Sequence, residues 1–166
     1  LCKSGWAQVV INHRTTFIPV GYKAVFYEDT SHEATLQEIV VLDQQGKFVA
    51  SPKVLPNFGF KPAKLTYWAR VDVINNSSSI NDFILDLAFG NMRYVDFYIY
   101  HRQKLAKTYQ LGDFLGKKGR VFSHFGYAIR LPPQRDLRIY IRMQPYSGQA
   151  LFPLGISELQ TFFNIS

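Results

Sequence analysis

The chain is 166 residues long, and 47% of its residues are hydrophobic and 16% aromatic. This length fits one domain with its own core, and so apolar a composition excludes an intrinsically disordered chain. The single cysteine, Cys2, excludes an intramolecular disulfide and a thiolate metal cluster. No stretch approaches the roughly 18 apolar residues that span a membrane, so we expect a soluble, excised or processed piece whose signal peptide or anchor lies elsewhere.

The formal net charge of +7 prompts a test for nucleic-acid binding. Residues 1–80 carry eight Lys and Arg against six Asp and Glu, and residues 81–166 carry eleven against six. The excess is modest. Its densest run, residues 117–120, is short and flanked by glycine, which is typical of a solvated loop or of part of an anionic-ligand site. We therefore expect no nucleic-acid partner.

Taken in chain order, residues 1–22 are the least regular and predict a leading arm, while residues 23–166 predict one domain. Residues 35–42 predict a short helix, in which Thr35 caps the N-terminus and Glu38 completes a capping box. Elsewhere apolar residues occupy every second position, which predicts strands. The expected strands are 6–11, 23–27, 67–74, 82–89, 93–100, 103–109, 125–131, 137–144 and 150–156.

About nine strands and one short helix predict an all-β protein. Clusters of Gly, Pro, Asn and Ser, such as 75–79 and 132–136, supply the backbone angles that end strands, and a further turn is expected at 157–162. Strands joined without intervening helices cannot form a parallel sheet, so the sheets should be antiparallel. We expect them to pack face to face as a β-sandwich.

The alternation also sorts strand residues onto two faces. One set is apolar and predicts the core: Tyr67, Ala69, Val71, Val73, Phe83, Leu85, Leu87, Val95, Phe97, Ile99, Leu137, Ile139, Ile141 and Met143. The other set mixes rings with Arg and Asp: Trp68, Arg70, Asp72, Asp86, Tyr94, Asp96, Tyr98, Tyr100, Arg130, Arg138, Tyr140 and Arg142. Rings that stack on sugars and guanidinium groups that bind oxygens indicate a binding face. Cross-strand pairs of these types also stabilise sheets, by roughly 0.2–1 kcal/mol each, so a structural role stays open.

An ordered series of motifs resembles one family of receptors. The most specific motif is Tyr67-Trp68-Ala69-Arg70, with Asn75-Asn76-Ser77 closing that strand. The others are 22–29 (YKAVFYED), 35–39, 57–60, 94–100, 112–113, Arg120 and 137–142. Together they resemble the type 2 extracellular domain of the bacterial seven-transmembrane receptors with diverse intracellular signalling modules, over roughly residues 20–160.

This resemblance implies a periplasmic or otherwise extracytoplasmic jelly roll, galactose-binding-like and related to carbohydrate-binding modules. It also implies a place in an inner-membrane receptor, before transmembrane helices that feed a histidine kinase, a diguanylate cyclase or a similar output. The family implies no particular ligand.

Signatures of enzymes are thin. The four histidines are scattered without metal-binding spacing, so we expect neither a metal nor a cofactor. Asp86 and Asp96 on neighbouring strands would suit glycoside hydrolysis, but such acids more often pair with arginines such as Arg70 or Arg142. We expect a protein that is not an enzyme.

The leading hypothesis is a sensor that binds a carbohydrate-like or anionic small ligand on an exposed sheet face. The residues expected to bind it are Trp68, Arg70, Asp96, Tyr98, Arg120, Tyr140 and Arg142. The rings would stack, the arginines would hold oxygens, and Asp96 would orient an arginine. An alternative is that the same face docks a protein or pairs two receptors, because flat surfaces rich in aromatics and Arg also suit proteins. A glycan-processing enzyme is the third hypothesis.

Overall fold

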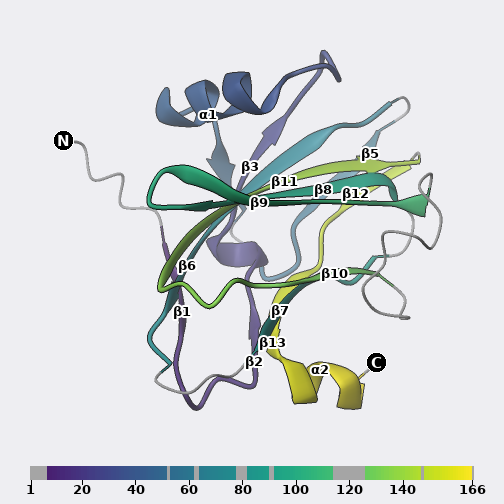
Figure 1. Cartoon of the computed structure of the whole chain (residues 1–166). Helices are drawn as coiled ribbons and strands as arrows, with labels where there is room; N and C mark the ends of the chain where they lie inside the picture. Colours follow the sequence, from purple (N-terminus) through teal and green to yellow (C-terminus); the bar gives the residue numbers. More distant parts are fainter. Residues whose placement is uncertain are drawn as a thin grey trace.

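Two β-sheets pack face to face in the computed structural model, with one helix above the larger sheet and one beside the smaller (Figure 1). The predicted all-β, mainly antiparallel sandwich is confirmed. The structure describes residues 7–51, 53–61, 64–77, 82–89, 92–113, 126–146 and 148–165. The basic run 117–120, which includes Arg120, and the first residue of the expected strand 125–131 lie outside the described residues.

The larger sheet has seven strands in the order β4–β3–β6–β11–β8–β9, with β1 beside the end of β6. They are β1 (Val9–Ile11), β3 (Val25–Glu28), β4 (Val49–Ala50), β6 (Tyr67–Asn75), β8 (Met92–His101), β9 (Lys104–Leu111) and β11 (Asp136–Pro145). Their pairings are antiparallel except that of β1 with β6, which is parallel. Because β6, β11 and β8 are long and central, they form the platform on which the outer face is built.

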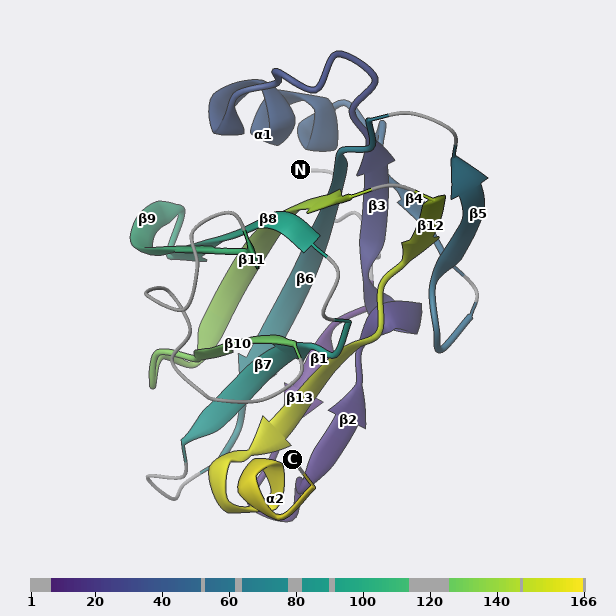
Figure 2. The same ribbon diagram turned by 90° about the vertical axis from the view of Figure 1, so that its right-hand side faces the viewer.

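The smaller sheet has four strands in the order β10–β7–β13–β2, and two further strands pair at the side (Figure 2). The four are β2 (Phe17–Pro19), β7 (Phe83–Leu87), β10 (Tyr127–Arg130) and β13 (Leu154–Glu158), and the side pair is β5 (Asn57–Lys61) with β12 (Gly148–Leu151). The helical segments are η1 (Gly21–Lys23), α1 (Leu36–Gln44) and α2 (Leu159–Ile165).

The core lies between the two sheets and is built from the apolar set that the alternation predicts. All fourteen residues of that set are buried and belong to one hydrophobic cluster. Phe26, Tyr67 and Phe152 extend this cluster with stacked and tilted ring contacts. Burial of side chains from both sheets gives the dominant favourable term in folding.

Helix α1 forms where the sequence predicts a helix, and its ends have clear causes. The Thr35 side chain accepts from the backbone of Glu38, and the Glu38 carboxylate accepts from the backbone of Thr35 at 2.7 Å, so the capping box is confirmed. At the other end Gly46 has a φ of 74°, which glycine adopts at little cost, and its N–H donates to the Asp43 carbonyl at 2.9 Å. The helix lies across the outer face of the larger sheet (Figure 1).

Several sequence predictions need correction. Residues 1–22 are not an irregular arm throughout, because β1 pairs with β6 and β2 pairs with β13. The described residues form thirteen strands, not nine, since β2, β4 and β5 are short and lack a long alternation and the expected strand 150–156 is divided into β12 and β13. The expected turn at 157–162 is the end of β13 followed by α2. The division into an arm and residues 23–166 as one domain otherwise stays a prediction.

Candidate functional site

The outer face of the larger sheet is organised in rows that cross β6, β11 and β8. Strand register places Asp72, Arg138 and Tyr100 in one row. The next two rows are Arg70–Tyr140–Tyr98 and Trp68–Arg142–Asp96, and Gln144 then pairs with Tyr94. For the residues of β6, β8 and β11, the alternation therefore predicts correctly which side chains share this face. Asp86 and Arg130 do not share it, because β7 and β10 belong to the smaller sheet.

Helix α1 buries part of this face. The exposed fractions of Trp68, Arg70 and Tyr140 are 1%, 4% and 2%. The expectation that these three side chains face solvent is wrong, because Ile39 of α1 and the adjacent Phe48 pack against Trp68 and Tyr140 in a second hydrophobic cluster. Sequence alternation reports which side of a sheet a residue takes but not which element covers that side.

The buried polar groups of this region converge on one carboxylate of α1. Asp43 accepts from Nη1 of Arg70 at 2.6 Å and from the hydroxyl of Tyr140 at 2.6 Å. Burial, with the Asp43 carboxylate beside it, raises the pKa of Tyr140 well above its usual range. The hydroxyl therefore stays a donor. These contacts fasten α1 to the sheet.

Beside this region lies a group in which Trp68 and Asp96 are buried and Tyr98 and Arg142 are partly exposed. Trp68 and Tyr98 stack with ring centroids 5.8 Å apart. Nη1 of Arg142 donates to Asp96 at 3.3 Å, and the two side chains are 23% and 8% exposed. Burial raises the pKa of Asp96, while its hydrogen bond and ion pair with Arg142 act in the opposite direction. Asp96 thus orients an arginine, as the sequence suggests.

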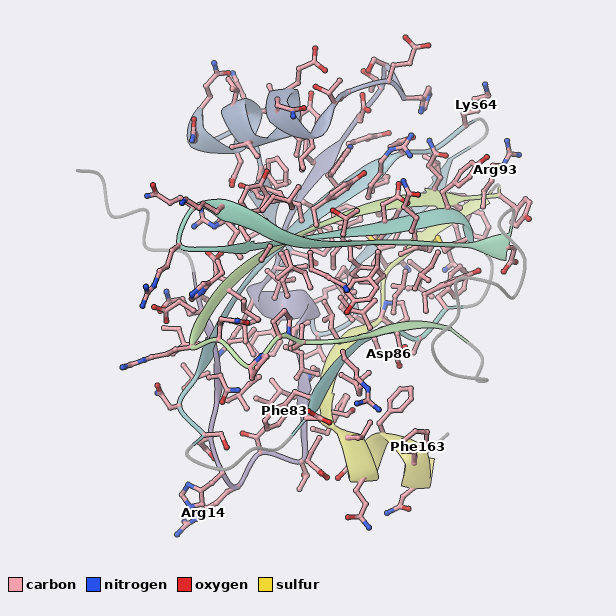
Figure 3. All side chains as sticks on the ribbon, in the orientation of Figure 1. Arg14, Lys64, Phe83, Asp86, Arg93 and Phe163 are labelled. Atoms are coloured by element: carbon pink, nitrogen blue, oxygen red, sulfur yellow. The ribbon has the colours of Figure 1, made fainter. Side chains whose placement is uncertain are left out.

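Beyond that row the outer face opens into a cleft of about 320 Å³, named here the Arg93 cleft. It is lined by Ser31, His32, Glu33, Lys64, Leu65, Arg93, Tyr94, Gln144, Pro145 and Tyr146. Figure 3 shows Lys64 and Arg93 at the same end of the larger sheet, on the side that carries α1. The cleft therefore continues the face that sequence alternation identifies, on the part that α1 leaves open.

A β-bulge directs Arg93 into the cleft. Gln144 of β11 pairs with Tyr94 and Pro145 pairs with Met92, so Arg93 is the extra residue on β8. Met92 is buried in the core, whereas Arg93 and Tyr94 both line the cleft. Without the bulge, Arg93 would share the inward side of Val95. A bulge redirects a side chain in this way at the end of a regular ladder.

The chain that follows β9 packs directly against this bulge. A Cβ at Gly112 would clash with the carbonyl oxygen of Arg93 and lie 2.7 Å from Cα of Tyr94. Gly112 also has a φ of 123°, where other residues are strained. From the smaller sheet, the buried hydroxyl of Tyr127 accepts from the backbone N–H of Met92 at 3.3 Å. The backbone around Arg93 is thus held from two sides.

Residues 31–33, in the loop before α1, form the opposite wall of the Arg93 cleft. The buried Asp29 carboxylate accepts from the backbone N–H groups of Ser31, His32 and Ala34, each at 3.1 Å, and from the Ser31 hydroxyl at 2.6 Å. This network holds His32 at a φ of 63°. Nδ1 of His32 lies 3.2 Å from the hydroxyl of Thr66, which also accepts from Gln144 at 3.0 Å. The wall is therefore ordered before any ligand enters.

A second hollow, of about 730 Å³, lies on the other side of the same loop, between the loop and α1. It is lined by Tyr27, Asp29, Thr30, Ser31, Glu33, Ala34, Gln37, Glu38, Val41 and Leu42. It is larger and more open, but its charged lining is acidic and Asp29 and Glu38 are already engaged by backbone groups. The Arg93 cleft offers the better set of free donors.

Other candidate chemistry finds less support. Asp86 and Asp96 do not lie on neighbouring strands, because β7 and β8 belong to different sheets. The described residues contain no group of three or more His, Cys, Asp or Glu side chains placed to hold a metal ion. Arg120 lies outside the described residues. The alternation does not identify His32, Lys64, Arg93, Gln144 and Tyr146, for which the only local signals are the Gly112 position and the departure from alternation at Arg93.

A family model described as 7TMR-DISM extracellular 2 matches residues 21–158. The chain belongs to this family. It is therefore an extracytoplasmic domain of the seven-transmembrane receptor type that the motif series resembles, and the predicted location is confirmed. A comparison with curated proteins gives no match. Within the described residues, no helix has both the length and the apolar character needed to cross a membrane.

Proposed function

We propose that this 7TMR-DISM extracellular 2 domain is the sensor of a bacterial signalling receptor and that it binds a carbohydrate-like or anionic small ligand in the Arg93 cleft. In this proposal the output is of the histidine kinase or diguanylate cyclase type. The observation that carries the proposal is the cleft itself, in which the Tyr94 and Tyr146 rings accompany the side chains of Lys64, Arg93 and Gln144. Small-molecule sites combine a concave shape, apolar rings and a few convergent polar groups.

The residues expected from the sequence take different roles around this cleft. Asp96 and Arg142 lie one row along the outer face from Gln144 and Tyr94, next to the cleft but outside its lining, and Tyr98 lies one row further. Trp68, Arg70 and Tyr140 act indirectly, because they hold α1. Its N-terminal cap at Thr35 continues directly from the cleft wall.

A thermal-shift screen tests the proposal with neutral monosaccharides, sugar acids, sugar phosphates and small dicarboxylates. A ligand at one hundred times its Kd stabilises the folded state by about 2.7 kcal/mol, which raises the Tm of a domain of this size by roughly 5–10 °C. Removing a ring from the cleft, as in Tyr146→Ala, should abolish the shift.

Tyr22→Ala is the matched control for Tyr146→Ala. Tyr22 is 40% exposed and Tyr146 38%, and each ring lies beside a cation, namely Lys23 at 5.7 Å for Tyr22 and Arg93 at 5.5 Å for Tyr146. Tyr22 does not line the Arg93 cleft. A stabilising ligand whose effect is equal in both variants would place binding elsewhere and refute the proposed site.

A second candidate function is a docking or dimerisation module. Phe60, on the small β5–β12 sheet, is 80% exposed, and Val54 and Leu55 are exposed on the segment before β5. Large exposed apolar side chains are typical of surfaces that contact other proteins. Sedimentation velocity over a hundredfold range of concentration distinguishes the two functions, because Phe60→Ser should shift a monomer–dimer equilibrium and leave ligand binding unchanged.

A further inference from the structure

We propose that the Arg93 cleft selects ligands that carry an oxyanion, a carboxylate or a phosphate, and that Arg93 together with Lys64 makes this selection. The inference rests on the proposed function, because it assigns a ligand class to the same cleft. It goes further in separating acidic ligands from neutral sugars and in naming the residue that decides between them.

Arg93 and Lys64 differ from the arginines elsewhere on the strands in the pairing of their charges. All twelve Asp and Glu residues of the chain lie among the described residues. The strand arginines other than Arg93 each form an ion pair with an aspartate: Arg70 with Asp43, Arg130 with Asp82, Arg138 with Asp72 and Arg142 with Asp96. Among these carboxylates, none forms an ion pair with Arg93 or Lys64. The cleft therefore holds two cations that form no ion pair with an Asp or Glu of the chain.

The Arg93 side chain is held against a ring and has an unpaired donor. Its guanidinium carbon lies 5.5 Å from the centroid of the Tyr146 ring, which restricts the plane of the group. Its Nε is shielded from solvent and has no hydrogen-bond partner. A shielded donor without an acceptor is costly, so a small shift of the guanidinium toward the cleft, where an incoming oxyanion would supply the acceptor, relieves that cost. Nε and one Nη of arginine are spaced to bind both oxygens of a carboxylate or two oxygens of a phosphate.

The charged side chains that line the cleft are divided between its two walls. Glu33 is the one carboxylate among the cleft-lining residues, and it lies on the loop wall with Ser31 and His32. Arg93 comes from the first residues of β8, and Lys64 comes from the segment before β6. A ligand with its oxyanion toward Arg93 and a hydroxyl toward Glu33 would supply an acceptor on the sheet side of the cleft and a donor on its loop wall. A neutral sugar would leave the two cations unbalanced.

Nuclear magnetic resonance of the arginine Nε–H groups tests the inference directly. The Arg93 cross-peak is assigned by its loss in Arg93→Gln. The probes are acetate, inorganic phosphate, D-galacturonate, galactose 6-phosphate and D-galactose, at ionic strength held constant with chloride. We expect a saturable shift of the Arg93 peak with at least one of the four anions and none with D-galactose. A sugar acid and a sugar phosphate in the same series distinguish the two oxyanion classes.

The variants complete the test, with the backbone amide peaks of Tyr94 and Gln144 as the readout. Arg93→Gln should weaken the binding of the anion at least tenfold. Arg135→Gln, an equal change of charge at the opposite end of β11, should leave it within twofold. Arg93→Lys keeps the charge but loses the planar guanidinium, so its affinity for the anion should lie between those of Arg93→Gln and Arg135→Gln.

The outcomes distinguish failure of the oxyanion inference from failure of the proposed site. Binding of D-galactose and D-galacturonate with equal affinity, lost in Tyr146→Ala and kept in Arg93→Gln, overturns the oxyanion inference and leaves the proposed function standing. The absence of a saturable shift with every one of the four anions also overturns the inference. If no compound of the thermal-shift screen stabilises the domain in a manner that depends on Tyr146, the proposed site fails as well.

Discussion

Replacing Asp43 by Ala should be among the most destabilising single changes in the domain. The carboxylate accepts two hydrogen bonds of 2.6 Å, from Arg70 and Tyr140, and the Asp43 and Arg70 side chains are 2% and 4% exposed. Removing one partner of a buried ion pair leaves an uncompensated charge and costs about 3–5 kcal/mol. A folded domain has a total stability of only about 5–15 kcal/mol, so this loss is a large share of it.

Urea denaturation followed by circular dichroism measures this loss, and two variants make the interpretation specific. Asp82→Ala removes the carboxylate of an exposed pair with Arg130, 3.2 Å apart, and should cost no more than about 1 kcal/mol. A triple variant, Asp43→Leu with Arg70→Met and Tyr140→Phe, replaces the whole network by apolar groups and should recover most of the stability. A cost below about 1 kcal/mol for Asp43→Ala would refute the account of how α1 is held.

Two further predictions concern Asp96 and Gly112. Burial raises the folded-state pKa of Asp96 above its usual 3.8, so the stability it contributes is fully present below the unfolded pKa and is lost as the pH rises through the folded value. Its carboxyl carbon resonance should therefore titrate above 3.8, and Arg142→Gln should raise the midpoint further, because Arg142 favours the ionised form; a midpoint at or below 3.8 would contradict this. Gly112→Ala should cost more than about 1–3 kcal/mol by urea denaturation, because strain at a positive φ adds to a clash with the backbone of Arg93. Gly46→Ala, also at positive φ but in open space, is the control and should cost less.

The sequence predicts the sandwich well because one side of each long strand is uniformly apolar. In β6, β8 and β11 the residues at every second position are apolar, and a shift of one residue would turn the whole set away from the core between the sheets. The register is therefore fixed by composition alone. The capping box at Thr35 is equally local, since both of its hydrogen bonds join residues three apart. The short strands β2 and β4 form through tertiary pairing, and no local pattern of two or three residues reveals them.

The candidate site was less predictable because it depends on contacts distant in the chain. Asp43 and Arg70 are 27 residues apart, and Asp43 and Tyr140 are 97 residues apart. A stripe of rings and guanidinium groups has the same pattern whether a ligand or a helix of the same chain covers it. Here α1 covers Trp68, Arg70 and Tyr140, and the family's most specific motif therefore includes residues that hold the fold together.

Arginines on such a face can be sorted by whether the chain supplies their counter-charge. Arg70, Arg138 and Arg142 each have an aspartate within 3.3 Å, and their positions follow the regular alternation. Arg93 departs from the alternation through a bulge that Gly112 permits, and no Asp or Glu side chain, all of which lie in the described part of the chain, pairs with it. Alternation alone assigns Arg93 to the core side with Val95, where an unpaired charge would be too costly to bury. That conflict between pattern and chemistry, together with the glycine at position 112, is the signal in the sequence that points to the cleft.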